Sequence, residues 1–148
     1  MSEYNGAKEN IMGRVTVDFE VSNYADVHEV EAGHLTADKV RKVIVQGIVD
    51  TGAARLVLPE SIVKQLGLPV AGMSTVRFAD SRRAEREVVR DAYIQLLGRS
   101  GVFHAIVEPN RSDALLGAIV MEDLDLIVDC SGQRLEKRDP DKYITEIE

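Results

Sequence analysis

The sequence has little cysteine, a deficit of positive charge and no long apolar run. Its single cysteine, Cys130, excludes an intrachain disulfide and makes a reducing, cytoplasmic location the expectation. Among the 148 residues, 18 Lys and Arg stand against 25 Asp and Glu, and this net charge of −7 argues against a general nucleic-acid binder. No apolar stretch approaches the roughly 20 residues of a membrane span, and residues 1–14 lack the apolar centre of a signal peptide. We therefore expect neither a nucleic acid nor a membrane as a partner.

Several kinds of chemical site are also missing. No metal is expected, because the histidines have no metal-ligand spacing; they are His28, His34 and His104. Nothing resembles a phosphate-binding loop, and no cofactor is expected. Nothing near Cys130 in the sequence would activate its thiol. No linker or low-complexity segment divides the chain, and its length suits one domain.

Short apolar runs predict strands along most of the chain. Residues 15–21 alternate between apolar and polar and predict a half-buried strand. Residues 43–49 are more continuously apolar and predict a strand buried on both faces. The charged segment 22–42 between them is interpreted as a long hairpin connection with a ragged second arm. Further apolar runs predict a hairpin over 76–89, a second hairpin over 92–107, and short strands at 55–58, 126–128 and 134–135.

Two short helices interrupt these strands. Residues 59–67 have a proline at the start, Glu60 in the first turn and Gly67 at the end, which is typical of a helix. A second short helix is predicted over 118–124. Many short strands with two small helices favour an all-β closed sheet. The regions that lead to these two helices share an apolar pair, a glycine and then the helix, which indicates two similar halves. Only the first half carries an acid before its glycine.

The stretch GIVDTGAARLVLP, residues 47–59, stops an apolar run at Asp50. Burying a carboxylate is costly unless hydrogen bonds or an opposite charge compensate. One interpretation is a turn aspartate that bonds its own backbone. Asp129 also follows an apolar strand, but it precedes Cys-Ser-Gly and is interpreted as a turn residue.

The order of these motifs resembles that of the retropepsin-like aspartic proteases, the single-lobe relatives of pepsin and of the retroviral proteases, and in particular their bacterial members. The matching stretches are Val49-Asp50-Thr51-Gly52-Ala53, Leu56–Pro59, Gln65–Leu68, Leu115-Leu116-Gly117 with its helix, Asp125–Asp129 and Gly132–Leu135. The resemblance implies a closed acid-protease barrel with one or two short helices that acts as a homodimer. It divides the chain into a flexible N-terminus (1–11), a retropepsin-like domain (12–137) and a charged C-terminal tail (138–148).

The resemblance also implies an aspartic endopeptidase that acts on polypeptides. This chemistry needs two carboxylates that share one proton, because like charges about 3 Å apart cannot both ionise. The sequence has a single Asp-Thr-Gly, so the catalytic pair is expected to be Asp50 and the partner's Asp50. In the supporting loop, Thr51 is expected to bond across to its counterpart, and Gly52 to bring a backbone amide close to the carboxylate. Ala53 lacks the hydroxyl found there in many pepsin-like members, which predicts a working pH from mildly acidic to near neutral.

A protease of this kind also needs a flap over its substrate, and the hairpin 76–89 is the candidate. Its tip residues Ala79, Asp80 and Ser81 are the expected substrate-binding residues. After its tip residues the hairpin carries three arginines, which either form a solvated face or favour acidic substrates; they are Arg82, Arg83 and Arg86.

These arginines and the segment 22–42 keep a second function open. Either could obstruct the cleft, which would suit a non-catalytic retropepsin-fold module that binds peptides or proteins. Such a module would gain little from two buried carboxylates that repel each other. The intact Asp-Thr-Gly-Ala motif therefore favours the peptidase.

Overall fold

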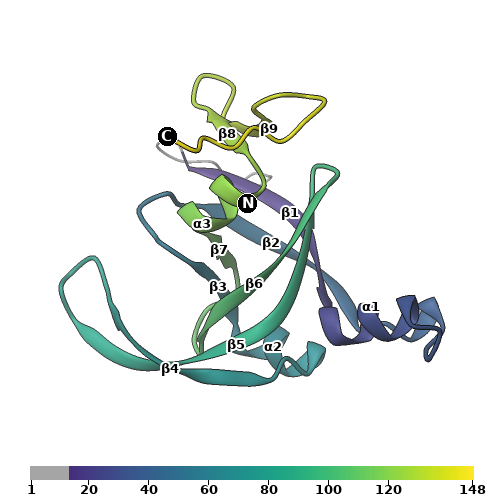
Figure 1. Ribbon diagram of the computed structural model, residues 1–148. Coiled ribbons are helices and arrows are strands. Elements are labelled where there is room, and N and C mark those ends of the chain that lie inside the picture. Colours follow the sequence, from purple (N-terminus) through teal and green to yellow (C-terminus); the bar gives the residue numbers. More distant parts are fainter. Residues whose placement is uncertain (1–13) are drawn as a thin grey trace.

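Six strands close into a β-barrel in the computed structural model, which describes residues 14–148 (Figure 1). The barrel order is β1-β2-β7-β3-β6-β5, and it closes because β5 pairs with both β6 and β1. The strands are β1 (Val15–Asn23), β2 (Lys42–Val49), β3 (Leu56–Pro59), β4 (Val70–Arg77), β5 (Arg83–Leu96), β6 (Arg99–Glu108), β7 (Ala114–Leu116), β8 (Leu126–Asp129) and β9 (Arg134–Lys137). The predicted closed β-barrel with few short helices is confirmed. The expected flexible segment 1–11 lies outside the described residues.

The helices are short, and two of them close the barrel core. They are α1 (Tyr24–Glu31), the 3-10 turn η1 (Ala37–Lys39), α2 (Glu60–Leu66) and α3 (Ala118–Asp123). Leu66 of α2 and Val120 of α3 are fully buried against the apolar barrel interior, where each such side chain stabilises by about 1.5–3 kcal/mol. Gly67 ends α2 with φ +63°, as its place in the sequence predicts. No helix within residues 14–148 is long and apolar enough to cross a membrane.

The expectation that β2 is buried on both faces is wrong. Val45 is buried, but Ile44 is 62% exposed and Gln46 is exposed as well. A barrel strand turns alternate side chains inward and outward, and no helix of the described chain covers the outer face of β2. Its apolar run therefore fills the core with one face only.

The segment 22–42 is also different from the prediction, because it holds α1 and η1 instead of a second strand. The side chain of Asn23 caps α1 by accepting a hydrogen bond from the Asp26 amide at 3.2 Å. Asp26 in turn accepts from the Arg41 guanidinium, with Nε at 2.9 Å, which closes the excursion at its base. This pairing lowers the pKa of the Asp26 carboxyl. No residue of α1 is buried, and its sequence therefore shows no helical periodicity of apolar residues.

The two predicted hairpins share one long strand, β5, which first pairs with β4 and then with β6. β4 pairs with β5 alone, and residues 73–87 pair only within this hairpin, so they project from the barrel as an arm (Figure 1). Val88 and Val89 pair with both β4 and β6, and a bulge between Val89 and Ala92, with Asp91 at φ +68°, lies within the β5–β6 pairing. The candidate flap is therefore a two-stranded extension of a barrel strand.

The charged tail after β9 folds back on its own chain. Arg99, only 5% exposed, donates from Nη1 to the carbonyl oxygens of Leu124 and Asp125, both at 2.9 Å, and from Nη2 to that of Lys142 at 2.8 Å. The guanidinium also lies 4.5 Å from the centre of the Tyr143 ring. One buried arginine thus holds the end of α3 and the tail together.

Candidate active site

The Asp50 loop (residues 50–54) begins where β2 ends, beside the end of β7. β2 and β7 run parallel with Val49 opposite Leu116, and the Asp50 amide donates to the Leu116 carbonyl oxygen at 3.0 Å. Parallel neighbours end at the same edge of a sheet. The first residue after each strand, Asp50 and Gly117, therefore meet at one end of the barrel.

Two hydrogen bonds within the loop orient the Asp50 carboxylate. The Gly52 amide donates to its Oδ1 at 3.0 Å, and the Ala53 amide donates to the Asp50 carbonyl oxygen at 3.1 Å. A Cβ at Gly52 would lie 3.1 Å from the same Oδ1, which is tighter than an ordinary contact. Glycine is suited to this position because it lets the amide approach the carboxylate.

A second glycine, Gly117, fixes the loop to α3. The α3 amides of Ala118 and Ile119 donate to the carbonyl oxygens of Ala53 and Ala54, at 2.8 Å and 3.0 Å. A Cβ at Gly117 would lie 2.4 Å from the Arg55 carbonyl oxygen. Sequence reasoning did not assign Gly117 to the site; its signals were the repeated pattern of an apolar pair followed by glycine and the place of Leu115-Leu116-Gly117 among the stretches that resemble the family.

The carboxylate of the loop faces outward in the single chain. Asp50, Thr51 and Gly52 are all exposed, and Ala53 is half-buried. The Thr51 hydroxyl has no hydrogen-bond partner among residues 14–148. No buried charge has to be compensated here, since the loop stands open at the end of the barrel.

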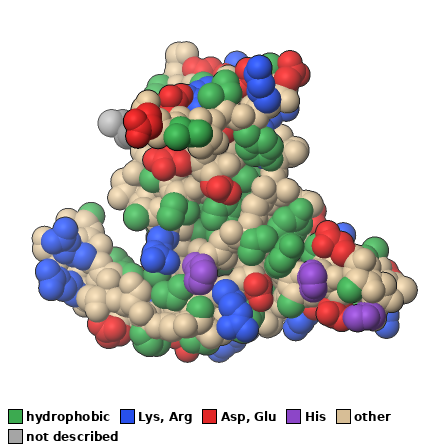
Figure 2. Space-filling model, viewed as in Figure 1, with side chains coloured by type: hydrophobic (Ala, Val, Ile, Leu, Met, Phe, Trp, Pro, Cys, Tyr) green, Lys and Arg blue, Asp and Glu red, His purple; other side chains and the backbone are tan. Residues whose placement is uncertain are grey.

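A groove of about 600 Å³ lies between the Asp50 loop and the arm. We call it the central groove. On one side it is lined by Gly52–Arg55 and by residues of β3, β6 and the β6–β7 loop, and on the other by Ser74–Phe78 of the arm. Figure 2 shows the hollow between the arm and the body of the molecule. The lining of the groove therefore joins the Asp50 loop to the arm.

The predicted contact residues at the arm's tip lie outside the lining of the central groove in the single chain. Ala79, Asp80 and Ser81 form a tight turn in which the Ser81 amide donates to the Phe78 carbonyl oxygen at 2.9 Å. Ser81 takes φ +72°, so the turn reaches the left-handed region without the glycine of the retroviral pattern. Residues of β4 line the groove in their place.

Two of the three arginines that follow the tip of the arm already have acidic partners. Arg82 Nε lies 2.7 Å from Asp80 Oδ2, a contact that lowers the pKa of the Asp80 carboxyl. Arg86 Nε lies 3.0 Å from Glu108 Oε1 in a half-buried pair. The charge that the sequence assigned to the arm is thus largely neutralised in place.

Comparison with known protein families decides what kind of chain carries this loop and groove. The model of a family described as aspartyl protease matches residues 37–120, more than half of the 148 residues. The chain belongs to the aspartyl protease family. The resemblance drawn from its sequence motifs is confirmed.

Solved structures add the fold of this aspartyl protease. A foamy viral protease-reverse transcriptase, solved with an RNA/DNA hybrid, matches at a TM-score of 0.50 and 14% identity over 74% of this chain and 12% of that one. This aspartyl protease therefore spans about 12% of the length of that viral chain, and the likeness is one of fold. The solution structure of a simian foamy virus (mac) protease has a TM-score of 0.42 at 14% identity, over 53% of this chain and 80% of that one. No curated protein matches at a significant level.

The remaining candidate residues of this aspartyl protease have structural roles. Asp129 accepts hydrogen bonds from the Gly132 amide at 3.1 Å and from the Ser131 hydroxyl at 2.9 Å, which lower the pKa of its carboxyl. The interpretation of Asp129 as a turn residue is confirmed. No group of His, Cys, Asp or Glu within residues 14–148 could hold a metal ion, and Cys130 is exposed.

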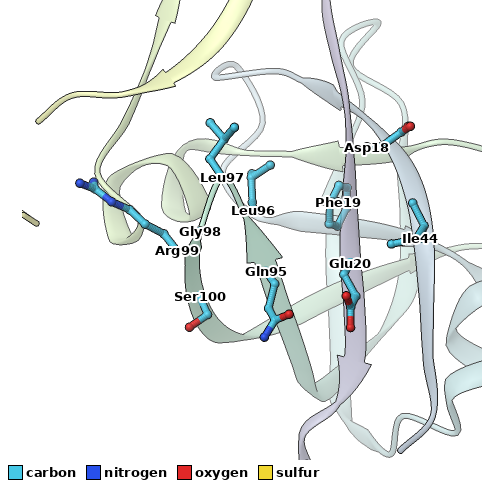
Figure 3. A pocket seen from close by; sticks show the side chains of 10 residues that line it. All are labelled: Asp18, Phe19, Glu20, Ile44, Gln95, Leu96, Leu97, Gly98, Arg99 and Ser100. Carbon is cyan, nitrogen blue, oxygen red and sulfur yellow. The ribbon is translucent and has the colours of Figure 1, made fainter. Parts of the chain in front are cut away.

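A second hollow, of about 440 Å³, lies between β1 and the turn that joins β5 to β6 (Figure 3). It shares no lining residue with the central groove. Its two carboxylates, Asp18 and Glu20, follow each other on one strand and point in different directions in Figure 3. This hollow offers no carboxylate pair for hydrolysis.

Proposed function

We propose that this protein is an aspartic endopeptidase that hydrolyses peptide bonds as a homodimer, with Asp50 and the partner's Asp50 as the catalytic pair. One observation carries the proposal. The exposed Asp50 carboxylate is held by the amide of Gly52 at 3.0 Å, and Gly52 itself lines a groove of about 600 Å³. Membership of the aspartyl protease family supports the same chemistry.

In the proposed reaction the two carboxylates share one proton. The ionised carboxylate takes a proton from a bound water, whose oxygen attacks the scissile carbonyl carbon. The protonated partner donates its proton to the carbonyl oxygen, and a tetrahedral diol forms. The first carboxyl then gives the proton it took from water to the amide nitrogen, while the other carboxylate takes a proton from a hydroxyl of the diol. The carbon–nitrogen bond breaks, and one proton remains on the pair.

A homodimer follows from the count of acids. The sequence holds a single Asp-Thr-Gly, and Thr51 and Gly52 are exposed in one chain. A twofold axis through the site would bring both loops together in an isologous contact. The Thr51 hydroxyl would then bond across to the other loop, as the family resemblance implies.

The polypeptide substrate would lie extended between the Asp50 loop and the arm. β4 pairs with β5 alone, so its other edge presents backbone amides and carbonyls that can bond an added strand. The arm would act as the flap, with Ser74–Phe78 facing the substrate backbone and Ala79, Asp80 and Ser81 at its tip. We place this activity in the cytoplasm because the sole cysteine fits a reducing compartment.

No observation favours the alternative of a blocked, non-catalytic binding module. None of the residues 22–42 lines the central groove, and α1 projects on the opposite side of the barrel from the arm's tip in Figure 1. Arg82 and Arg86 are paired with carboxylates and so do not fill the groove with unpaired charge.

The test is casein hydrolysis by the full chain at several pH values, with and without pepstatin. We expect cleavage with an optimum from mildly acidic to near neutral pH, and a loss of at least about 1,000-fold in Asp50→Asn because the pair loses its base. Asp129→Asn is the matched control, since it makes the same change at another strand end. Cleavage that survives Asp50→Asn would overturn the proposal, and an optimum below about pH 3 would contradict the role of Ala53.

A further inference from the structure

The central groove carries positive charge on a protein that is negative overall. Its charged lining residues are three arginines and one glutamate, within a chain of net charge −7; they are Arg55, Arg77, Arg111 and Glu108. The glutamate is paired with Arg86 at 3.0 Å. A cleft lined by one sign of charge concentrates ligands of the opposite sign.

Arg111, in the loop between β6 and β7, has the geometry of a carboxylate receptor. Its Nε donates to the Asp113 carbonyl oxygen at 3.0 Å, which fixes the plane of the half-buried guanidinium. Among residues 14–148, no carboxylate lies within ion-pair distance of it. Nη1 and Nη2 therefore remain for a bidentate contact with the carboxylate of a ligand.

Arg55 brings a second cation close to the reacting bond. It follows the Asp50 loop directly, and its backbone is held against Gly117, where a Cβ would lie 2.4 Å from the Arg55 carbonyl oxygen. Its side chain is exposed, and within the described residues it has no acidic partner. It lines the central groove and both hollows that adjoin His104.

The other arginines contribute less to the groove. Arg77 also lines the groove, but it lies at the exposed C-terminal end of β4, on the arm rather than on the body that carries the Asp50 loop. Arg82 and Arg86 are neutralised by Asp80 and Glu108. Figure 2 shows basic side chains at the end of the arm as well as on the body beside the hollow; the second group bears on substrate choice.

We infer that the central groove takes peptides with Asp or Glu close to the scissile bond, and that Arg111 and Arg55 are the specificity-determining residues. The inference rests on the proposed peptidase function, since it names the substrate class of that same site. A substrate carboxylate would replace the water around Arg111, and closure of the arm would strengthen the pair by excluding solvent.

The first experiment digests a library of proteome-derived peptides with the full chain and reads the cleaved positions by mass spectrometry. Asp and Glu should be enriched on one or both sides of the cleaved bonds. Arg111→Gln and Arg55→Gln should each reduce that enrichment by about fivefold, the size expected of a half-exposed ion pair. Arg111→Glu should favour Lys and Arg instead.

The matched control is Arg134→Gln, which removes one positive charge from exposed β9, outside the groove lining. It should leave the enrichment unchanged. An unaltered enrichment in the Arg55→Gln/Arg111→Gln double variant would overturn the inference. So would variants that weaken the homodimer in sedimentation but keep the same cleavage preference, because the arginines would then act at the subunit contact.

A binding experiment separates this inference from the proposed function. Fluorescein-labelled acidic and neutral peptides of equal length are titrated into Asp50→Asn and followed by anisotropy. Preferential binding of the acidic peptide that Arg111→Gln abolishes, with no cleavage by the wild-type chain, would contradict hydrolysis and support the preference of the groove for acidic peptides. Cleavage without acidic preference in either experiment would support hydrolysis and overturn that preference.

Discussion

At the scale of single residues, two glycines hold the Asp50 loop in different ways. Gly52 lets its amide reach the Asp50 carboxylate at 3.0 Å. Gly117 lets the start of α3 pack onto the loop backbone, where a Cβ would lie 2.4 Å and 2.7 Å from the carbonyl oxygens of Arg55 and Ala53. The loop is therefore positioned both by a hydrogen bond within it and by the packing of α3 against its backbone.

Substituting Gly117→Ala should push α3 away from the loop. Its φ is −84°, so the cost is a steric clash with backbone and not conformational strain. We expect a loss of about 1–3 kcal/mol in the free energy of unfolding, as in overpacked cores, measured by urea denaturation. Peptidase activity should fall further than this loss of folded protein explains, because Asp50 is displaced.

Gly72→Ala is the control for this substitution. A Cβ at Gly72 on exposed β4 would meet nothing within 4 Å. Its stability should stay within about 0.5 kcal/mol of the wild type. Equal stability and activity in Gly117→Ala and Gly72→Ala would contradict the assigned contact.

Some of the site could be predicted from the sequence because its contacts are local. Asp50 and Gly52 are two residues apart, and their hydrogen bond needs only the turn between them. The contact of Gly117 with residues 53–55 and the placement of Arg111 depend on how β7 aligns with β2 and β3. Alignment across a barrel leaves no pattern in neighbouring sequence positions, so these residues were missed.

At the scale of elements, the apolar periodicity of the sequence predicted the strands and helices that bury apolar side chains and missed the helix that buries none. The strands β1, β2 and β3 and the helix α2 bury apolar side chains and lie close to their predicted bounds, whereas β7 was not predicted as a strand. α1 buries none, and it is held by the Asn23 cap and by the pairing of Asp26 with Arg41. The pairing of Asp26 with Arg41 joins residues 15 positions apart, and such a polar contact produces no periodic pattern in the sequence.

The C-terminal tail is held by hydrogen bonds to a carboxylate just after α3, and the strength of these bonds depends on pH. Asp125, next to the end of α3, accepts from the Ile144 amide and from Arg138 Nε, both at 2.8 Å. The Ile144 hydrogen bond, followed by Arg138, lowers the pKa of the Asp125 carboxyl below its usual 3.8. A lowered folded-state pKa gives stability that is present above pH 3.8 and is lost as the pH falls through the folded value.

We therefore expect the tail to detach in acid while the barrel persists. The Ile144 amide should lose its hydrogen-bonded NMR chemical shift and its exchange protection as the pH falls below about 4. In Asp125→Asn the tail should be looser at neutral pH and its state should not change over this range, because the side chain no longer titrates. Asparagine suits the left-handed backbone at this position, where φ is +55°.

Asp141→Asn serves as the control within the same tail. Asp141 is exposed, and its substitution should leave the acid transition of the Ile144 amide in place. An acid transition that persists unchanged in Asp125→Asn would show that another carboxyl controls the tail.

At the scale of the whole molecule, the fold class could be predicted from the sequence, whereas the oligomeric state has to be determined by experiment. Short apolar runs with turn residues between them specify a closed β-structure, and β1 completes the closure through its pairing with β5. The proposed dimer is a different kind of problem, because the Asp50 loop is exposed and stabilised in one chain without a second copy. Association then depends on how the charges of two chains meet.

The two Asp50 carboxylates should make dimerisation depend on pH. Both cannot stay ionised when they face each other across a twofold axis, so dimer formation takes up a proton. We expect the dimer dissociation constant, measured by sedimentation equilibrium at constant ionic strength, to rise by up to about tenfold per pH unit between pH 5 and 8. Asp50→Asn removes the repulsion and should dimerise more tightly at pH 8, with a weaker dependence on pH.

The overall charge of −7 per chain also opposes association at high pH, so a control must remove one charge elsewhere. Asp18→Asn does this on exposed β1, outside the Asp50 loop and the central groove. It should shift the dissociation constant only slightly and keep the wild-type slope with pH. Equal slopes for Asp50→Asn and the wild type would mean that the two acids do not meet in the dimer, whatever its stability, because repulsion between carboxylates at the axis cannot survive the loss of both charges.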